Sequence, residues 1–141
     1  MQIVNNQEGD VFCEYDNLDI LGGTVKGGIA VPFGRLTIGP GAAVVGSIVA
    51  SNVYISEGAC VSGSIKSAYN VENHGVIQEG VDGVKILHNY GVIEKDVFSV
   101  SFVRLHQRSL VGGNILADMV CQSVGSIVVG KIETPRMIEV E

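Results

Sequence analysis

Residues 39–48 read GPGAAVVGSI and residues 56–65 read SEGACVSGSI, so the chain nearly repeats itself after seventeen residues. The two stretches align without a gap, with glycine opposite glycine, valine opposite valine, and the same Gly-Ser-Ile at the end. A period this short is typical of a solenoid, in which each repeat forms one coil that stacks on the next. The repeat therefore indicates a structural role and not a glycine-rich binding loop.

The same rhythm continues toward the C-terminus. NHGVIQEGV at 73–81 returns as NYGVIEKDV at 89–97, a shift of sixteen residues, and SLVGGNI at 109–115 returns as SIVVGKI at 126–132, a shift of seventeen. The Gly-x-Ile signatures at Gly63 and Gly113 are 50 residues apart, which equals two coils of seventeen residues and one of sixteen. One lattice of coils therefore runs through most of the chain.

The short apolar pieces within each repeat have the period of a β-strand. Leu36 and Ile38 alternate with polar residues, as do Val53 and Ile55 one repeat later, and Gly, Ser and Asn bound them. No stretch sustains the apolar spacing of a helix. The sequence predicts an all-β fold, a single-stranded parallel β-helix of about seven coils of 16–18 residues, about 33 Å long.

The spacing of the aliphatic residues bears on the hand of the helix. Left-handed hexapeptide solenoids place an aliphatic residue at every sixth position. Counted from Ile38, this rule is met at Val44 and fails at Ser56. The unequal sides of the coil favour a right-handed β-helix.

The chain is expected to form one domain over residues 1–141. Residues 1–17 fit the repeat poorly and are assigned to an irregular N-terminal cap. Residues 18–134 form the regular coils, and residues 135–141 form a C-terminal edge strand or tail. No Pro-rich or Gly/Ser-rich linker divides the chain.

Composition excludes several classes of function. The net charge of −6 argues against nucleic-acid binding, which usually needs a basic face that releases counterions from phosphates. The three cysteines, Cys13, Cys60 and Cys121, have no metal-binding spacing and indicate a reduced, cytoplasmic protein. No signal peptide opens the sequence.

Three ring-bearing residues recur at one lattice position. His74, Tyr90 and His106 are sixteen residues apart, and Asn73 and Asn89 stand directly before the first two. Two coils would separate the histidines by about 9.6 Å, too far to share one metal ion. We expect a structural stack beside an asparagine ladder, with no catalytic residue, no metal and no cofactor.

The V-x-G-x-I pieces of the coils resemble those of bactofilins. They read VVGSIVA at 44–50, VSGSIKS at 61–67, VGGNILAD at 111–118 and VVGKIET at 128–134, and the resemblance covers residues 18–134. It implies a bacterial cytoskeletal scaffold with a right-handed β-helix core that polymerises end to end without nucleotide.

The resemblance also implies partners and a location. The main partner would be a second copy of the chain, with envelope or cell-shape proteins as further partners. Many members carry a hydrophobic membrane-targeting segment at the N-terminus. The stretch QIV at 2–4 is a weak anchor, so we expect a cytoplasmic protein, with the inner face of the membrane as the alternative location.

The two terminal coils are the expected contacts of such a polymer, because a solenoid's end coils expose unpaired strand edges and an open apolar core. The candidate contact residues are Ile3, Val4 and Phe12 at one end and Met137, Ile138 and Val140 at the other.

Two other functions remain open at this point. A left-handed hexapeptide-type enzyme, either an acyltransferase or a gamma-class carbonic anhydrase, would need a strict six-residue rhythm and histidines that converge at a subunit interface. A binding module without polymerisation would use the flat outer face near Tyr54, Tyr69 and Tyr90.

Overall fold

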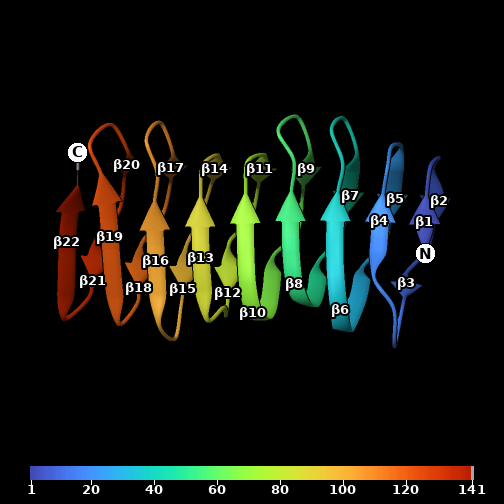
Figure 1. The fold of residues 1–141 in the computed structure, drawn as a ribbon. Helices are drawn as coiled ribbons and strands as arrows, with labels where there is room; N and C mark the ends of the chain where they lie inside the picture. Colours follow the sequence, from blue (N-terminus) through green and yellow to red (C-terminus); the bar gives the residue numbers. More distant parts are fainter. Residues whose placement is uncertain (141) are drawn as a thin grey trace.

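The chain winds into a parallel β-solenoid (Figure 1). The structure is a computed structural model that describes residues 1–140. Within that range there are 22 strands, every strand pair is parallel, and no helix is present that could cross a membrane. The predicted all-β solenoid is confirmed.

Each coil has three faces. The first face contains β1 (Gln2–Ile3), β4 (Leu18–Ile20), β13 (Ile86–Asn89), β16 (Phe102–Leu105), β19 (Met119–Ser123) and β22 (Arg136–Val140). The second contains β2 (Gln7–Glu8), β5 (Thr24–Lys26), β7 (Ala43–Val45), β9 (Cys60–Val61), β11 (Val76–Ile77), β14 (Val92–Ile93), β17 (Leu110–Val111) and β20 (Ile127–Val128). The third contains β3 (Val11–Phe12), β12 (Val81–Asp82), β15 (Val97–Phe98), β18 (Ile115–Leu116) and β21 (Ile132–Glu133). Three long strands turn a corner and belong to both the third and the first face: β6 (Ile29–Ile38), β8 (Ile48–Ile55) and β10 (Ile65–Asn73).

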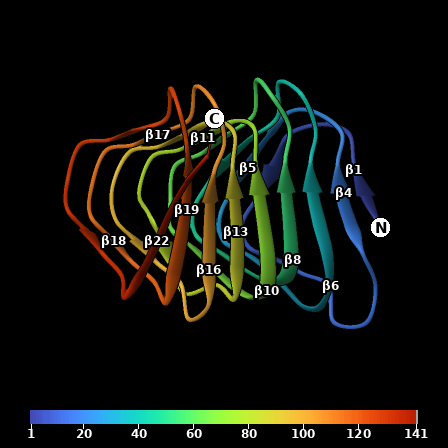
Figure 2. The same cartoon turned by 60° about the vertical axis from the view of Figure 1, so that its left-hand side comes forward.

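The solenoid is right-handed. In Figure 1 the chain rises along the near face, passes over the top to the far face, and descends there while it advances from right to left. Figure 2 shows the same path nearer to the coil axis. The predicted hand is confirmed, and it separates this fold from the left-handed hexapeptide solenoids.

The register between coils matches the spacing of the sequence repeat. Ile3 pairs with Ile20 and Ile20 with Ile38, at intervals of 17 and 18 residues. Asn73 pairs with Asn89, an interval of 16. The path from β1 to β22 along the first face makes about eight turns, one more than the sequence indicated.

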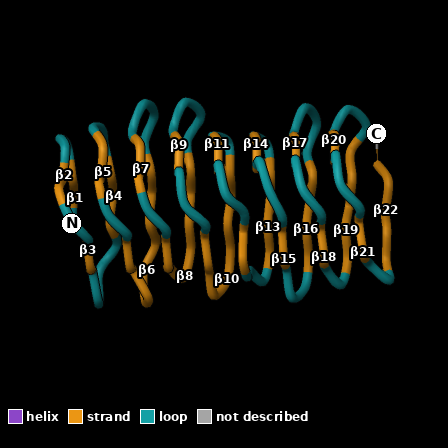
Figure 3. The backbone as a smooth tube through the Cα atoms, turned by 180° about the vertical axis from the view of Figure 1, so that it is seen from behind, coloured by secondary structure: helices purple, strands orange, loops and turns teal. Residues whose placement is uncertain are grey.

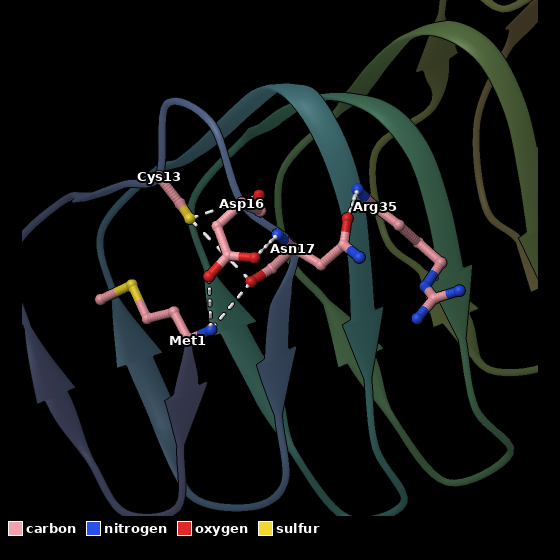
Figure 4. A network of polar contacts seen from close by, with 5 residues as sticks. All are labelled: Met1, Cys13, Asp16, Asn17 and Arg35. Atoms are coloured by element: carbon pink, nitrogen blue, oxygen red, sulfur yellow. Dashed lines mark hydrogen bonds and ion pairs between the residues drawn. The ribbon is translucent and has the colours of Figure 1, made fainter.

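The additional turn is formed by the first seventeen residues. β1, β2 and β3 each pair with the equivalent strand of the next coil. Polar contacts close this turn, as Figure 4 shows. The N-terminal amine of Met1 donates to Asp16 Oδ2 at 3.3 Å, and Asn17 Oδ1 accepts the backbone N–H of Arg35 at 2.8 Å. At the other end, β22 pairs with β19 as an edge strand, while Glu141 lies outside the described residues.

Aliphatic rows from all three faces fill the interior, and the first face has a second inward row that includes Ile20, Ile38 and Ile55. Strand alternation points every second residue inward, and register pairing stacks like upon like. The first face contributes Leu18, Leu36, Val53, Val71, Leu87, Val103 and Val120. The second contributes Val25, Val44, Val61, Ile77, Ile93 and Val111, and the third contributes Val11, Ile29, Ile48, Ile65, Val81, Val97 and Ile115. All are buried, so the Val- and Ile-rich composition supplies the core directly.

The corner between the first and second faces has a long and a short form, visible as tall and low loops in Figure 3. The long form is a four-residue turn in which the fourth amide donates to the first carbonyl at 3.1–3.2 Å. Its third residue has a positive φ in each case, as in a type II turn. That residue is Gly41, Gly58, Arg108 or Gly125.

The short form occurs in the two coils that begin at Asn73 and Asn89. Asn73 Oδ1 accepts the N–H of Gly75 at 3.1 Å, and Asn89 Oδ1 accepts that of Gly91 at 3.2 Å. The side-chain amide takes the place of a backbone turn, as asparagine commonly does. The shorter corner accounts for the sixteen-residue shift between these coils.

Candidate functional site

A column of rings stands along the first face, next to the short corners. The ring centroids of His74 and Tyr90 are 4.2 Å apart, and those of Tyr90 and His106 are 3.8 Å apart, each pair within 9° of parallel. Tyr54 extends the column at the N-terminal side, at 5.4 Å from His74 and tilted by 42°. The structure thus brings together the three residues that share a lattice position and adds a fourth.

Strand register builds this column. Asn73 pairs with Asn89 and Asn89 with Leu105, so the residues that follow them lie above one another. The glycines that follow His74 and Tyr90 allow the coils to approach closely. A Cβ at Gly91 would overlap the Gly75 carbonyl oxygen and lie 2.8 Å from the His74 carbonyl carbon. These glycines serve close packing of backbones, since neither has a positive φ.

An asparagine ladder lies directly inside the column. Asn73 and Asn89 have no exposed surface, and Asn73 Nδ2 donates to Asn89 Oδ1 at 3.0 Å. Their amides also donate to the carbonyl oxygens of Val92 and Leu110, at 3.2 and 3.3 Å. A buried amide is costly unless it is hydrogen-bonded, and here both are bonded on each side.

Polar side chains from the same strands flank the rings. Glu72 Oε2 lies 2.8 Å from His74 Nε2. His88 Nδ1 lies 3.0 Å from His106 Nε2, so one of the two nitrogens donates and the other accepts. Arg104 Nη1 donates to Cys121 Sγ at 3.3 Å.

His88 and Arg104 do not share the lattice position of the rings, so the sixteen-residue spacing does not include them. Both point outward from the strands that precede the rings, two residues earlier in the chain. A side chain at such a position can reach the ring of the next coil, because the coils are only about 4.8 Å apart. The signal that could have identified them is this outward position in the register.

The surroundings of His106 favour the neutral form of its imidazole. Its pKa is lowered from the ordinary histidine value first by burial and then by the charge of Arg104 and the neighbouring His88. His74 lowers this pKa further, and Glu72 opposes the shift. A neutral ring suits its hydrogen bond to His88 and its parallel contact with Tyr90.

A pocket of about 350 Å³ opens at the C-terminal end of the column. It is lined by Tyr90, Arg104, His106, Gln107 and Ser123. Three of these side chains bear nitrogen donors or a cation. The pocket therefore offers a ring face and hydrogen-bond donors to one ligand.

The structure places the six predicted polymer contacts at the two ends of the solenoid. Ile3 is buried in β1, while Val4 and Phe12 are 59% and 62% exposed. At the other end, Val140 is half-buried in β22, and Met137 and Ile138 are 41% and 44% exposed. Of the three tyrosines considered for a binding face, Tyr54 and Tyr90 lie in the column, while Tyr69 lies at the register shift between Ser67 and Asn70.

Within residues 1–140 no three histidine, cysteine or acidic side chains are grouped closely enough to hold a metal ion. The fold thus presents a ring column, an asparagine ladder and one pocket as its candidate site. Comparison with family models, curated proteins and solved structures finds no match for this chain.

Proposed function

We propose that the protein is a non-enzymatic structural element that associates end to end with further copies of itself. The resulting filament would act as a cytoskeletal scaffold and would need no nucleotide. The resemblance of the V-x-G-x-I coils to bactofilins supports this function.

The single observation that carries the proposal is the exposure of the inner row in the last turn. Val120 and Met137 are register partners on the inward side of the first face, yet Val120 is fully buried while Met137 is 41% exposed. Val128 and Ile132, which hold the inner rows of the other two faces, are also only partly buried. Covering these side chains with another coil would bury apolar surface, which favours association.

The backbone at each end supports the same proposal. Within residues 1–140, β20, β21 and β22 each pair on one side only, as do β1, β2 and β3 at the opposite end. The unpaired N–H and C=O groups of such edges can pair with another strand, and β22, with five residues, offers the longest of them. A second copy could extend the ladder of the first face at β22, which stands one strand level beyond β20 and β21.

The N-terminal end adds exposed apolar side chains. Val4 and Phe12 stand at this rim and present 59% and 62% of their surface. Ile3 and Val11 in the same turn are nearly covered, at 8% and 6%. The N-terminal end therefore exposes apolar side chains at its rim, while its inward side chains are already buried. Such a surface suits packing against the C-terminal turn, whose inward side chains are partly exposed.

Negative-stain microscopy of the purified full chain without nucleotide tests this function. We expect filaments from the wild type and their loss in Ile138→Arg and in Phe12→Arg, because a charge at an apolar contact is costly to desolvate. Val100→Arg is the matched control. Val100 is 65% exposed and lies between β15 and β16, away from both ends, so this variant should still polymerise.

Three results would contradict the proposal: single particles from the wild type at every concentration, filaments from both end variants, or equal loss in the Val100→Arg control. Circular dichroism of each variant separates loss of association from loss of folding. The enzyme alternative has its own readout, since a discrete trimer with stoichiometric zinc would support it instead.

A further inference from the structure

The ring column stops one position short of the last coil. Leu105 pairs with Gln122, so the residue above His106 in the column is Ser123. Serine has no ring, and the coil spacing of about 4.8 Å leaves the position above His106 without a stacking partner. The pocket of about 350 Å³ lies at this position.

The wall of the pocket carries a cation without a carboxylate partner. Arg104 lies half-buried in β16, and within residues 1–140 its guanidinium forms no ion pair, whereas the exposed Arg136 pairs with Asp118. Its observed side-chain acceptor is the Cys121 sulfur, a weak one. A guanidinium normally presents several donors to an oxyanion, and bidentate pairing with a carboxylate is its strongest mode.

The ring face and the cation lie in the same pocket, together with the amide of Gln107 and the hydroxyl of Ser123. We propose that this pocket binds a planar aromatic carboxylate. The ring of the ligand occupies the column position that Ser123 leaves open and stacks on His106. The carboxylate accepts hydrogen bonds from Arg104, with Gln107 beside it.

Each part of the ligand is required for a separate physical reason. Stacking on His106 continues a series of parallel contacts already 3.8 and 4.2 Å apart, so a flat group fits where a tetrahedral one does not. The carboxylate supplies the missing partner of a half-buried charge. A ligand with the anion alone or the ring alone should lose most of the binding.

Three probes separate these contributions: benzoate, acetate and phenol, each titrated into the full-length protein. Isothermal calorimetry gives the dissociation constant. Saturation-transfer NMR, which observes the ligand, remains usable if the protein forms filaments. We expect saturable binding of benzoate, with acetate and phenol each weaker by about tenfold or more.

Two variants test the assigned residues. Arg104→Gln removes the cation and should weaken benzoate about tenfold or more. Ser123→Phe extends the column with a side chain and should block benzoate by filling its place. Arg108→Gln is the matched control, since it removes a neighbouring charge that does not line the pocket, and its dissociation constant should stay within about twofold of the wild type.

The proposal is overturned if benzoate shows no saturable binding at about 10 mM, where even a millimolar site would be mostly occupied. It is equally overturned if acetate or phenol binds as tightly as benzoate, or if Arg104→Gln binds benzoate like the wild type. Ser123 is 5% exposed, so Ser123→Phe could unfold. If Ser123→Phe unfolds, Arg104→Gln still tests the proposal, because Arg104 lies at the surface of β16 and its replacement should leave the fold intact. Failure here leaves the end-to-end association untouched, because the pocket lies on a side face.

Discussion

Asn73 Nδ2 donates a hydrogen bond to Asn89 Oδ1 at 3.0 Å, and neither side chain is exposed to solvent. The two amides occupy an interior row whose neighbours, Ile55 and Leu105, are aliphatic. They hold the short corners in place, because each also accepts the amide of the glycine two residues later. The ring column thus depends on a buried polar ladder.

Asn89→Leu should lower the free energy of unfolding by about 2–4 kcal/mol, because it removes the side-chain partners of the buried Asn73 amide and of the Leu110 carbonyl. Urea denaturation measures this change. The matched control is Asn70→Ala in β10, whose side chain bonds Asn52 at 3.3 Å on the exposed surface. That variant should change stability by less than about 0.5 kcal/mol, and equal effects would contradict a special role for the ladder.

Gly91→Ala should destabilise the fold by about 3 kcal/mol or more, because the new Cβ meets fixed backbone atoms of Gly75 and His74. Thermal unfolding followed by circular dichroism is the readout. Gly22→Ala is the control, since its Cβ would meet only the Val4 carbonyl at 3.5 Å, an ordinary contact. A Gly91→Ala protein as stable as Gly22→Ala would show that the coils are not packed this closely.

Arg108→Gly should stabilise the protein by about 0.5–1 kcal/mol. Arg108 has a φ of 66° at a turn position that glycine holds in three other coils, and side chains disfavour this conformation. The reciprocal change Gly58→Arg should destabilise by about 1 kcal/mol or more. Denaturant midpoints of the two variants check both signs, and stabilisation by Gly58→Arg would disprove the explanation.

Acidification should destabilise the protein through His106. Its pKa is lowered in the folded state, so the unfolded chain binds more protons as the pH falls through the ordinary histidine value of about 6.5. Stability from this group is therefore complete above that value and is lost below it. The melting temperature should fall between about pH 8 and about pH 5.5, and less steeply in His106→Gln. An unchanged slope in that variant would place the effect elsewhere.

Much of the architecture could be predicted from the sequence because a solenoid turns sequence spacing into spatial stacking. His74, Tyr90 and His106 share a lattice position, so their alignment required only the coil length. The first turn was harder to recognise. Its strands have only two residues each and it lacks the Gly-x-Ile signature, but they pair in register all the same.

Side-chain reach accounts for what the sequence could not predict. The contact between His88 and His106 joins two neighbouring coils and two different outward rows, so it depends on the side-chain rotamers. The contact between Arg104 and Cys121 depends on rotamers in the same way. The pocket arises because Ser123, a small residue, stands where the previous three coils each have a ring. No sequence motif marks the absence of a ring at this position. Strand alternation predicts that Asn73 and Asn89 point inward. The hydrogen bond between their side chains also depends on the short corner between the first and second faces, which the sequence does not reveal.

End-to-end association is tested most directly by the power spectrum of the filaments in electron micrographs. Stacked solenoids place every strand across the filament, so end-to-end association predicts a reflection at about 4.8 Å along the filament axis. The nine strand levels of the first face also predict an axial repeat of about 43 Å per copy, or twice that. Filaments whose 4.8 Å reflection lies perpendicular to their axis, or wild-type protein that forms no filaments, would contradict it.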